Sequence, residues 1–181
     1  MTETLTYDVV IIGSGIAGLR AAIEAARLSV GKCNIAVITK VQAMRSHSVS
    51  AEGGTAAVLY PDKGDMFESH IYDTVKGSDF LADQDAVEFF AYAMPAEIYR
   101  LEHWGMPWSR TEDGRIAQRD FGGYSFPRAT FAADKVGFFE MQTLYDTTRK
   151  FDDIHLFQEW YVTSLTVDYR VFRGITARIW M

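Results

Sequence analysis

The sequence predicts an α/β fold in which a parallel sheet with a β-meander is interrupted by a helical insertion. Three observations point to this class. Residues 7–30 run from a β-branched apolar stretch through a glycine-rich turn into a helical pattern. Residues 65–105 show only helical patterns, and residues 154–179 return to short alternating strands. Alternation of strands and helices is typical of a parallel sheet covered by helices.

The composition excludes several classes of protein. The 181 residues are 48% apolar and carry a net charge of -6, which indicates a folded chain. No apolar run approaches the roughly 18 residues of a membrane span, and no basic segment precedes the first apolar stretch, so a cytoplasmic protein is expected. Scattered Lys and Arg argue against nucleic acid as a partner. A single cysteine, Cys33, predicts no thiolate metal site, so an iron-sulfur centre would belong to another polypeptide.

The first predicted segment, residues 1–60, opens with a strand, a helix and a strand. Residues 7–12 suit a parallel strand buried on both faces. Apolar residues then recur at helical spacing until Val30-Gly31, and residues 35–39 give a second short strand.

The second segment, residues 61–135, is expected to be a helical insertion with a glycine loop. One helix is predicted to end at Gly77, and Asp83 has the character of a helix cap. Pro95 suits the first turn of a separate helix over 96–104. A turn at 112–114 leads to the loop Phe121-Gly122-Gly123.

The third segment, residues 136–181, predicts a helix over 136–150, a third strand over 154–158 and the start of a meander. The meander strands are 161–167 and 171–179. No glycine, proline or polar tail follows Ile179-Trp180-Met181, so the fold is expected to be truncated there.

The glycine turn has the spacing of a dinucleotide site. It reads Gly13-Ser14-Gly15-Ile16-Ala17-Gly18 and lies between a strand and a helix. Gly13 would permit the turn, Gly15 would let a pyrophosphate approach, and Gly18 would let the helix pack on the strand. The anion would then lie at the helix N-terminus. The alternative is a turn that serves packing only.

The end of the second strand disfavours NAD. An NAD site places an acidic residue about 20 residues beyond the turn, whereas this strand ends in Thr39-Lys40. A hydroxyl and a cation there could bind the ribose and phosphate of FAD. Lys40 could equally be a solvated surface lysine.

The loop after the second strand is placed to line a ligand crevice, because it follows the carboxyl end of a parallel strand. Its serines offer hydroxyl groups, and its paired glycines let the backbone approach a flat ring. A histidine among serines is also compatible with an ordinary surface loop. The residues concerned are Ser46, His47, Ser48, Ser50, Ala51, Glu52, Gly53 and Gly54.

Together these motifs resemble the flavoprotein subunits of fumarate reductase and succinate dehydrogenase, with a lean toward fumarate reductase. The resemblance covers essentially the whole chain. It is carried by the segments 13–18, 39–40, 45–54, 72–79, 83–85, 101–105, 107–110, 113–115, 121–123 and 130–135.

The resemblance implies a Rossmann-like FAD-binding domain. It implies that FAD is bound covalently through a ring nitrogen of His47, which should raise the flavin reduction potential. The other implied FAD-binding residues are Gly13 to Gly18, Thr39, Lys40, Ser46, Ser48, Ser50 to Gly54 and, more weakly, Val162. Phe121 and Gly53 would bound the dicarboxylate, although Phe121 could also be a plain core aromatic.

The implied enzyme interconverts fumarate and succinate by hydride transfer at FAD, in anaerobic respiration or the tricarboxylic acid cycle. Electrons would pass to an iron-sulfur subunit and to quinone at membrane anchor subunits, with the protein peripheral on the inner face of the cell membrane. None of the four arginines Arg110, Arg115, Arg119 and Arg128 matches the family's proton-shuttle motif. The catalytic arginine is therefore expected beyond residue 181, and these residues alone are expected to be inactive.

Two alternatives stay open at this point. One is a flavoenzyme like L-aspartate oxidase, which shares the fold, holds FAD non-covalently and lacks a histidine matching His47. The other is a non-catalytic flavin-binding product.

Overall fold

The computed structural model describes residues 3–179. The chain divides into two compact units, a first unit of residues 1–49 and 141–181 and a second unit of residues 50–140. The domain limits at 60 and 135 stay predictions. Trp180 and Met181, on which the expected truncation depended, lie outside the described residues. Among residues 3–179, none of the helices combines the length and the hydrophobicity that a membrane span requires.

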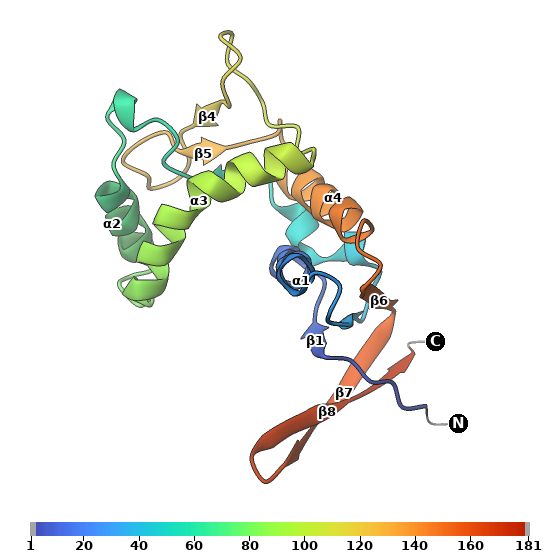
Figure 1. Cartoon of the computed structure of the whole chain (residues 1–181). Coiled ribbons are helices and arrows are strands. Elements are labelled where there is room, and N and C mark those ends of the chain that lie inside the picture. The colour runs from blue at the N-terminus through green and yellow to red at the C-terminus, as the bar shows by residue number, and fades with distance from the viewer. Residues whose placement is uncertain (1–2, 180–181) are drawn as a thin grey trace. The chain divides into compact units, whose positions relative to one another are not determined.

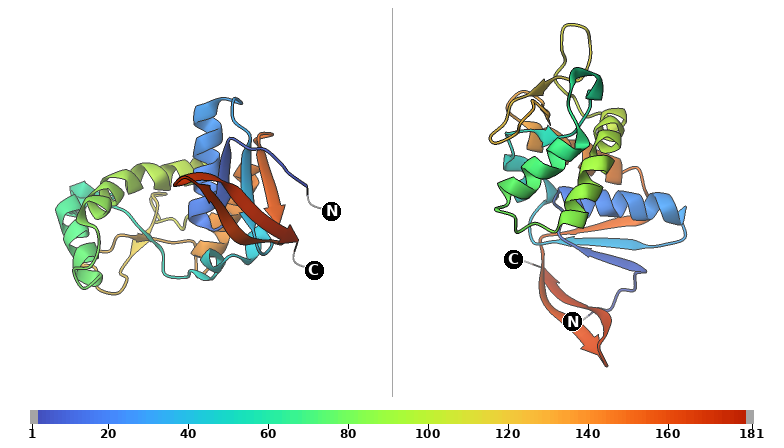
Figure 2. Two further views of the ribbon diagram at one scale, coloured as in Figure 1. Left: turned by 90° about the horizontal axis from the view of Figure 1, so that it is seen from below. Right: turned by 90° about the vertical axis from the view of Figure 1, so that its left-hand side faces the viewer.

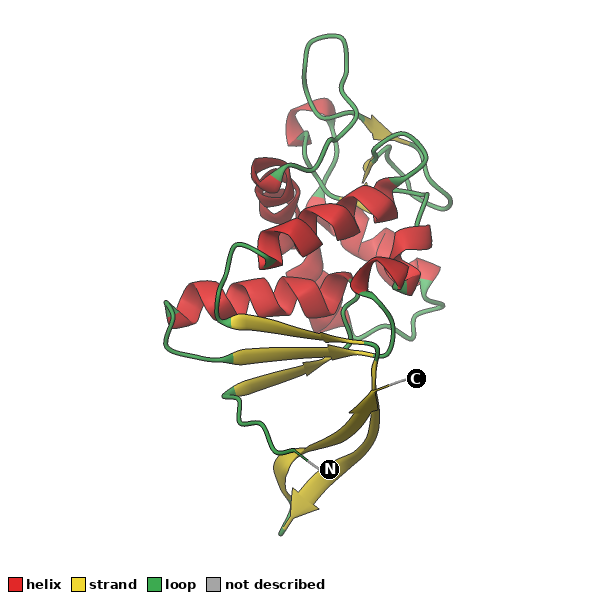
Figure 3. Ribbon diagram, turned by 90° about the vertical axis from the view of Figure 1, so that its right-hand side faces the viewer, coloured by secondary structure: helices red, strands yellow, loops and turns green. Residues whose placement is uncertain are grey.

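The first unit is built on a parallel sheet of β1 (Val9–Ile12), β2 (Ile35–Thr39) and β6 (Ile154–Gln158), in the order β1-β2-β6. Helix α1 (Ile16–Ser29) runs along one face of this sheet (Figure 3). These elements confirm the predicted strand, helix and strand, and the third strand.

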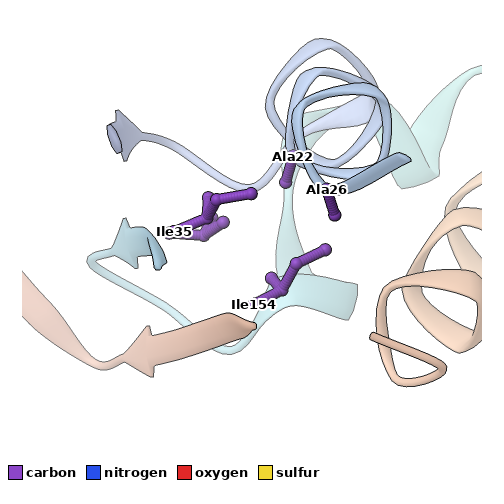
Figure 4. Packing of buried hydrophobic residues seen from close by; sticks show 5 residues of the cluster. Ala22, Ala26, Ile35 and Ile154 are labelled. Atoms are coloured by element: carbon purple, nitrogen blue, oxygen red, sulfur yellow. The ribbon is translucent and has the colours of Figure 1, made fainter. Parts of the chain in front are cut away.

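Small side chains let α1 lie close to the sheet. Ala22 and Ala26 point from the helix toward Ile35 and Ile154 of the strands, and all four are buried (Figure 4). Each alanine brings little bulk between helix and strand, while the isoleucines supply most of the buried apolar area. This packing fixes the start of α1, and with it the glycine turn, against the sheet.

Strand β1 differs from its prediction. Residues 7–12 were expected to be buried on both faces, but Ile12 is 53% exposed and the rest of β1 is only partly buried. The reason is position, because β1 is an edge strand of the described sheet, with β2 on one side only. The central strand β2 is the one whose five residues are all buried.

The predicted meander is a hairpin of β7 (Trp160–Asp168) and β8 (Val171–Ile179), which projects away from the parallel sheet (Figure 2). Tyr169 and Arg170 both have positive φ values, of 46° and 64°. Two such residues in a two-residue loop are typical of the tight turn whose twist matches a hairpin. The predicted turn at 168–170 is therefore confirmed.

In the second unit, helices α2 (Phe67–Gly77) and α3 (Gln84–Trp104) pack together beside short antiparallel strands (Figure 1). The strand order is β3-β5-β4, with β3 at Thr55–Ala56, β5 at Ala129–Thr130 and β4 at Gln118–Arg119. The chain returns to the first unit along helix α4 (Val136–Thr148), which starts in the second unit. The end of α2 at Gly77 is confirmed, and so is the helix predicted to begin at 136.

Helix α3 corrects the prediction of a separate helix starting at Pro95. The helix begins at Gln84, where the Asp83 side chain accepts a hydrogen bond from the backbone N–H of Ala86, and Pro95 lies inside it. A proline there removes one backbone hydrogen bond and bends the helix, and α3 changes direction along its length (Figure 1). Burial of apolar residues on both sides of the proline, namely Val87, Ala91, Ile98 and Leu101, offsets that cost.

Candidate functional site

The glycine turn of the first unit has the tight packing that its Gly-x-Gly-x-x-Gly spacing predicts. Gly13 has a φ of 108°, which favours glycine. A Cβ on Gly18 would lie 2.0 Å from the carbonyl oxygen of Gly13, so any side chain at this position would push α1 off the turn. The start of α1 is thus pressed directly onto the end of β1.

The turn opens onto a cavity of about 580 Å³ that lies wholly within the first unit. Ser14 lines this cavity and is 2% exposed, and its hydroxyl oxygen has no hydrogen-bond partner within residues 3–179. A buried hydroxyl without a partner is costly unless a ligand or water completes it. The other lining residues are Ile12, Gly13, Ile38, Thr39, Lys40, Val41, Arg45, Ser46, His47, Trp160, Tyr161 and Val162.

The loop serines come close to the N-terminus of α1. The backbone N–H of Ile16 donates to the Ser48 hydroxyl over 3.3 Å. A Cβ on Gly15 would lie 3.1 Å from the Ser48 oxygen and 3.4 Å from the Ser46 oxygen. Gly15 therefore leaves room for this loop, and Ser48 partly satisfies the free N–H groups of the helix end.

The end of β2 contributes a lysine to the same cavity, and β7 contributes Val162. Thr39 is buried at the end of β2, and the next residue, Lys40, is exposed. Val162 reaches the cavity from β7, beside an irregularity in the pairing of that strand. The cavity thus combines helix N–H groups, hydroxyls and a lysine, which together suit a phosphate-containing ligand.

His47 is exposed and starts the short 3-10 helix His47–Ser50. It lines the same cavity as Gly13, Lys40 and Val162. The structure therefore brings together residues that the sequence separates by more than 140 positions. Ala17 is exposed on α1, and Gly15, Ile16 and Gly18 are partly buried at its start.

The remaining predicted site residues lie in the second unit, within or beside the segment 51–55, here called the glycine loop. The Phe121 ring lies directly on Gly53, because a Cβ there would be 2.3 Å from the ring. Phe121 is 51% exposed, so its interpretation as a plain core aromatic is wrong. Ser50, Ala51 and Glu52 are exposed. Gly53 and Phe121 together form an apolar wall with an accessible backbone.

Arg119 also belongs to this region, although nothing in its sequence context predicts a role for it there. Its guanidinium donates to the carbonyl oxygens of Glu52, over 2.8 Å, and Gly53, over 2.9 Å, and lies 4.5 Å from the centre of the Phe131 ring. Such contacts fix a backbone that has no regular secondary structure. No local signal could have found Arg119, because its partners are 66 and 67 positions away.

A buried ion cluster holds the loop that carries Phe121. Arg128 is fully buried and forms ion pairs with Asp65 and Asp73. Asp73 also accepts hydrogen bonds from the backbone and hydroxyl of Ser125, over 2.8 and 2.7 Å. Burial opposes ionisation of Asp73, but the bonds from Ser125 and Arg128 hold its pKa below the usual value. Arg128 is thus a buried cation that links Asp65 and Asp73 within the second unit.

The remaining arginines and histidines have other surroundings. Arg110 pairs with Glu102, and Arg115 pairs with Asp113. His155 shares a hydrogen bond with the Tyr7 hydroxyl, over 2.9 Å, while buried His70 has no hydrogen-bond partner within residues 3–179. In that part of the chain, no three His, Cys, Asp or Glu side chains could hold a metal ion together.

These features define an FAD-binding domain. Residues 8–179 match the family described as the FAD binding domain, and the chain belongs to this family.

The more specific resemblance is to the flavoprotein subunits of two related complexes. The chain is 49% identical to the fumarate reductase flavoprotein subunit of Mycobacterium tuberculosis strain H37Rv, over 96% of this chain and 29% of that protein. It is 46% identical to the succinate dehydrogenase flavoprotein subunit of Coxiella burnetii, over 88% of this chain and 28% of that protein. The chain therefore spans less than a third of the length of these relatives.

A solved structure agrees with this assignment. An Escherichia coli quinol fumarate reductase superposes with a TM-score of 0.93 at 46% identity, covering 97% of this chain and 30% of that one. This match confirms the predicted fold class and the resemblance to fumarate reductase and succinate dehydrogenase flavoproteins.

The residues that line the cavity of the first unit also suit FAD. The Ser14 hydroxyl, which has no partner among the described residues, offers a hydrogen bond to a pyrophosphate, and the N-terminus of α1 and Lys40 offer positive charge. The end of β2 carries Thr39 and Lys40 in place of the acidic residue that is typical of NAD sites, which disfavours NAD.

Proposed function

We propose that the chain is the FAD-binding part of a flavoprotein subunit that interconverts fumarate and succinate, closer to fumarate reductase than to succinate dehydrogenase. The observation that carries this proposal is the single cavity shared by the glycine turn, Lys40 and His47. The similarity to flavoprotein subunits of both enzymes supports it.

The residues of the first unit divide the binding of FAD among themselves. The Ser14 hydroxyl and those N–H groups at the start of α1 that Ser48 does not occupy bind the pyrophosphate, with Gly15 to Gly18 forming the turn beneath it. Thr39 and Lys40 bind the ribose and phosphate, and the backbone of Val162 lies near the adenine. Ser46 and Ser48 keep the loop against α1, consistent with the bond from Ile16 to Ser48.

His47 is the proposed point of covalent attachment. It is exposed at the cavity, as a nucleophilic side chain must be if it is to reach a bound ring. A neutral imidazole is a good nucleophile near pH 7. Attachment would raise the flavin potential and so help oxidation of succinate, which is a poor reductant.

The glycine loop and Phe121 are the proposed substrate side. FAD, when bound, would supply hydride transfer to and from the C2–C3 bond of the dicarboxylate. The backbone of Gly53 and the ring of Phe121 would bound the substrate, with Ser50, Ala51, Glu52 and Gly54 along the flavin. No residue of this chain is proposed as the proton donor.

The proposal includes partners and a location. Electrons would be exchanged with an iron-sulfur subunit and then with quinone at membrane anchor subunits. The protein would lie on the cytoplasmic face of the cell membrane through these partners.

Acid precipitation of the full-length protein tests the covalent link. We expect flavin fluorescence to stay with the polypeptide in the wild type and in a His103→Ala control, whose histidine is exposed near the end of α3. His47→Ala should bind FAD but release it in acid. Succinate oxidation should then fall more than fumarate reduction, since only oxidation depends on a raised potential.

Two results would contradict the proposal. Release of all flavin from the acid-treated wild type would favour a flavoenzyme like L-aspartate oxidase. Equal loss of both activities in His47→Ala would contradict the role of the link in raising the potential.

A further inference from the structure

The first two turns of α4 hold both ends of the glycine loop. The backbone N–H of Gly137 donates to the carbonyl oxygen of Ala51 over 2.8 Å. Three residues later on the same helix, the Glu140 carboxyl group accepts a hydrogen bond from the Thr55 hydroxyl. Residues three apart lie on one side of a helix. The two contacts therefore bracket the residues between Ala51 and Thr55, which include both glycines.

Glu140 is an unusual residue for this position, because it is only 6% exposed. Glutamate is almost never fully buried without a partner, and its pKa is raised here because burial outweighs the bond from Thr55. No titratable side chain faces it from β3 or β5, whose residues are Thr55, Ala56, Ala129 and Thr130. A buried carboxyl group at this position stabilises the fold less than an apolar side chain of similar size would.

Thr55 links the Glu140 carboxyl group to the backbone next to Gly54. Its carbonyl oxygen accepts a hydrogen bond from the Thr130 hydroxyl over 2.6 Å, while its own hydroxyl group donates to Glu140. The preceding Gly54 has a φ of 131°, and a Cβ there would lie 2.7 Å from the carbonyl oxygen of Thr130. Gly54 is thus pressed against β5, and a shift of Thr55 would displace it.

We propose that Glu140 is a positioning residue that, through Thr55, fixes the backbone of Gly53 and Gly54 in the shape that the bound flavin and substrate require. This inference rests on the proposed function, since it assigns the glycine loop to the flavin. Glu140 acts through Thr55 without touching either ligand, and it transfers no proton. Its carboxyl group supplies one hydrogen bond at a distance from the reacting atoms.

Four variants of the full-length holoprotein test this inference. Thr55→Val removes the hydroxyl with little change of shape, and Glu140→Leu removes the carboxyl group. Thr55→Ser and Glu140→Gln keep a hydrogen-bonding group at each position. Glu88→Leu serves as the control, because Glu88 is exposed on α3.

The readouts are the visible absorption spectrum of the bound flavin, the acid-stable flavin content and the kinetics of fumarate reduction. We expect Thr55→Val and Glu140→Leu to shift the spectrum and to lower kcat/KM by about tenfold or more, since small misplacements near reacting groups have large effects. Thr55→Ser, Glu140→Gln and Glu88→Leu should keep the wild-type spectrum and stay within about twofold of its kcat/KM.

The outcomes separate the two proposals. A Thr55→Val holoprotein with wild-type spectrum and kinetics would overturn the role of Glu140 while leaving the proposed function intact, even if Glu140→Leu failed to fold. A wild-type protein that binds no flavin would overturn the proposed function and the positioning role with it. A shifted spectrum in Thr55→Val that Thr55→Ser restores supports the inference.

Discussion

The glycine turn of the first unit and the glycine loop of the second are both irregular segments that the proposed function assigns to the flavin, yet different interactions hold them. The turn is held by backbone contact, with Gly18 against the carbonyl of Gly13 five positions earlier. The loop is held by polar side chains of Arg119 and Glu140, which come from 66 and 85 positions away.

This difference shows which parts of the site tolerate change. Neither the turn nor Gly53 and Gly54 of the loop has room for an added atom, but the loop also depends on polar partners. Buried polar groups cost more when one partner is lost than they contribute when paired. Added bulk should therefore damage both segments, whereas loss of a polar side chain should damage mainly the second unit.

The largest expected effect is loss of the buried cation of the second unit. Arg128→Met would leave the carboxylates of Asp65 and Asp73 buried without their partner, at a cost of about 3 to 5 kcal/mol. Hydrogen exchange should show the loss of protection within residues 50–140 and not around α1. The matched control is Arg115→Met, whose exposed ion pair is worth at most about 1 kcal/mol. Equal effects of the two variants would show that the cluster does not stabilise this unit.

The next largest effect tests the opposite mechanism in the first unit. Gly18→Ala places a methyl group 2.0 Å from the Gly13 carbonyl oxygen, so we expect destabilisation of about 3 kcal/mol, located by hydrogen exchange at α1 and β1. Gly31→Ala is the control, since Gly31 lies just beyond the end of α1 and has no atom within 4 Å of the added group. Its positive φ should cost only about 1 kcal/mol. If Gly18→Ala cost no more than the control, close packing would not explain the third glycine of the motif.

The same contrast explains what the sequence could predict. The strand, glycine turn and helix, the third strand and the hairpin turn at 168–170 all follow from residues that are neighbours in the chain. The cavity residues Lys40 and His47 could be proposed because loops at the carboxyl ends of parallel strands share one edge of the sheet.

What the sequence could not predict depends on distant partners. Arg119 and Glu140 look like ordinary charged residues until the fold places Gly53 and Thr55 beside them. The prediction of a helix start at Pro95 was wrong for a related reason. Proline prefers the first turn of a helix, but burial of apolar residues on both sides of Pro95 outweighs this preference in α3. The exposure of Ile12 likewise depends on which strand occupies the edge of the sheet.

The smallest effect concerns the pH dependence of the second unit, through His70. This side chain is fully buried against the rings of Phe90 and Tyr124, and the charges that act on it come from Arg128, Asp65 and Asp73. Burial, assisted by Arg128, lowers the pKa of His70 below its usual 6.5. The unfolded chain therefore binds a proton more readily than the folded one.

The sign of the effect follows from that difference. The contribution of neutral His70 to the free energy of unfolding is fully present above about pH 6.5. It is lost as the pH falls toward the lower pKa of His70 in the folded state, by at most about 1.4 kcal/mol per pH unit for one proton. Urea unfolding between pH 7.5 and 5 should show a weaker acid loss in His70→Leu than in the wild type. His103→Leu, on an exposed histidine, should keep the wild-type slope. Identical slopes for all three proteins would mean that the imidazole gains a partner or water when it is protonated, and that the second unit is not acid-sensitive at this position.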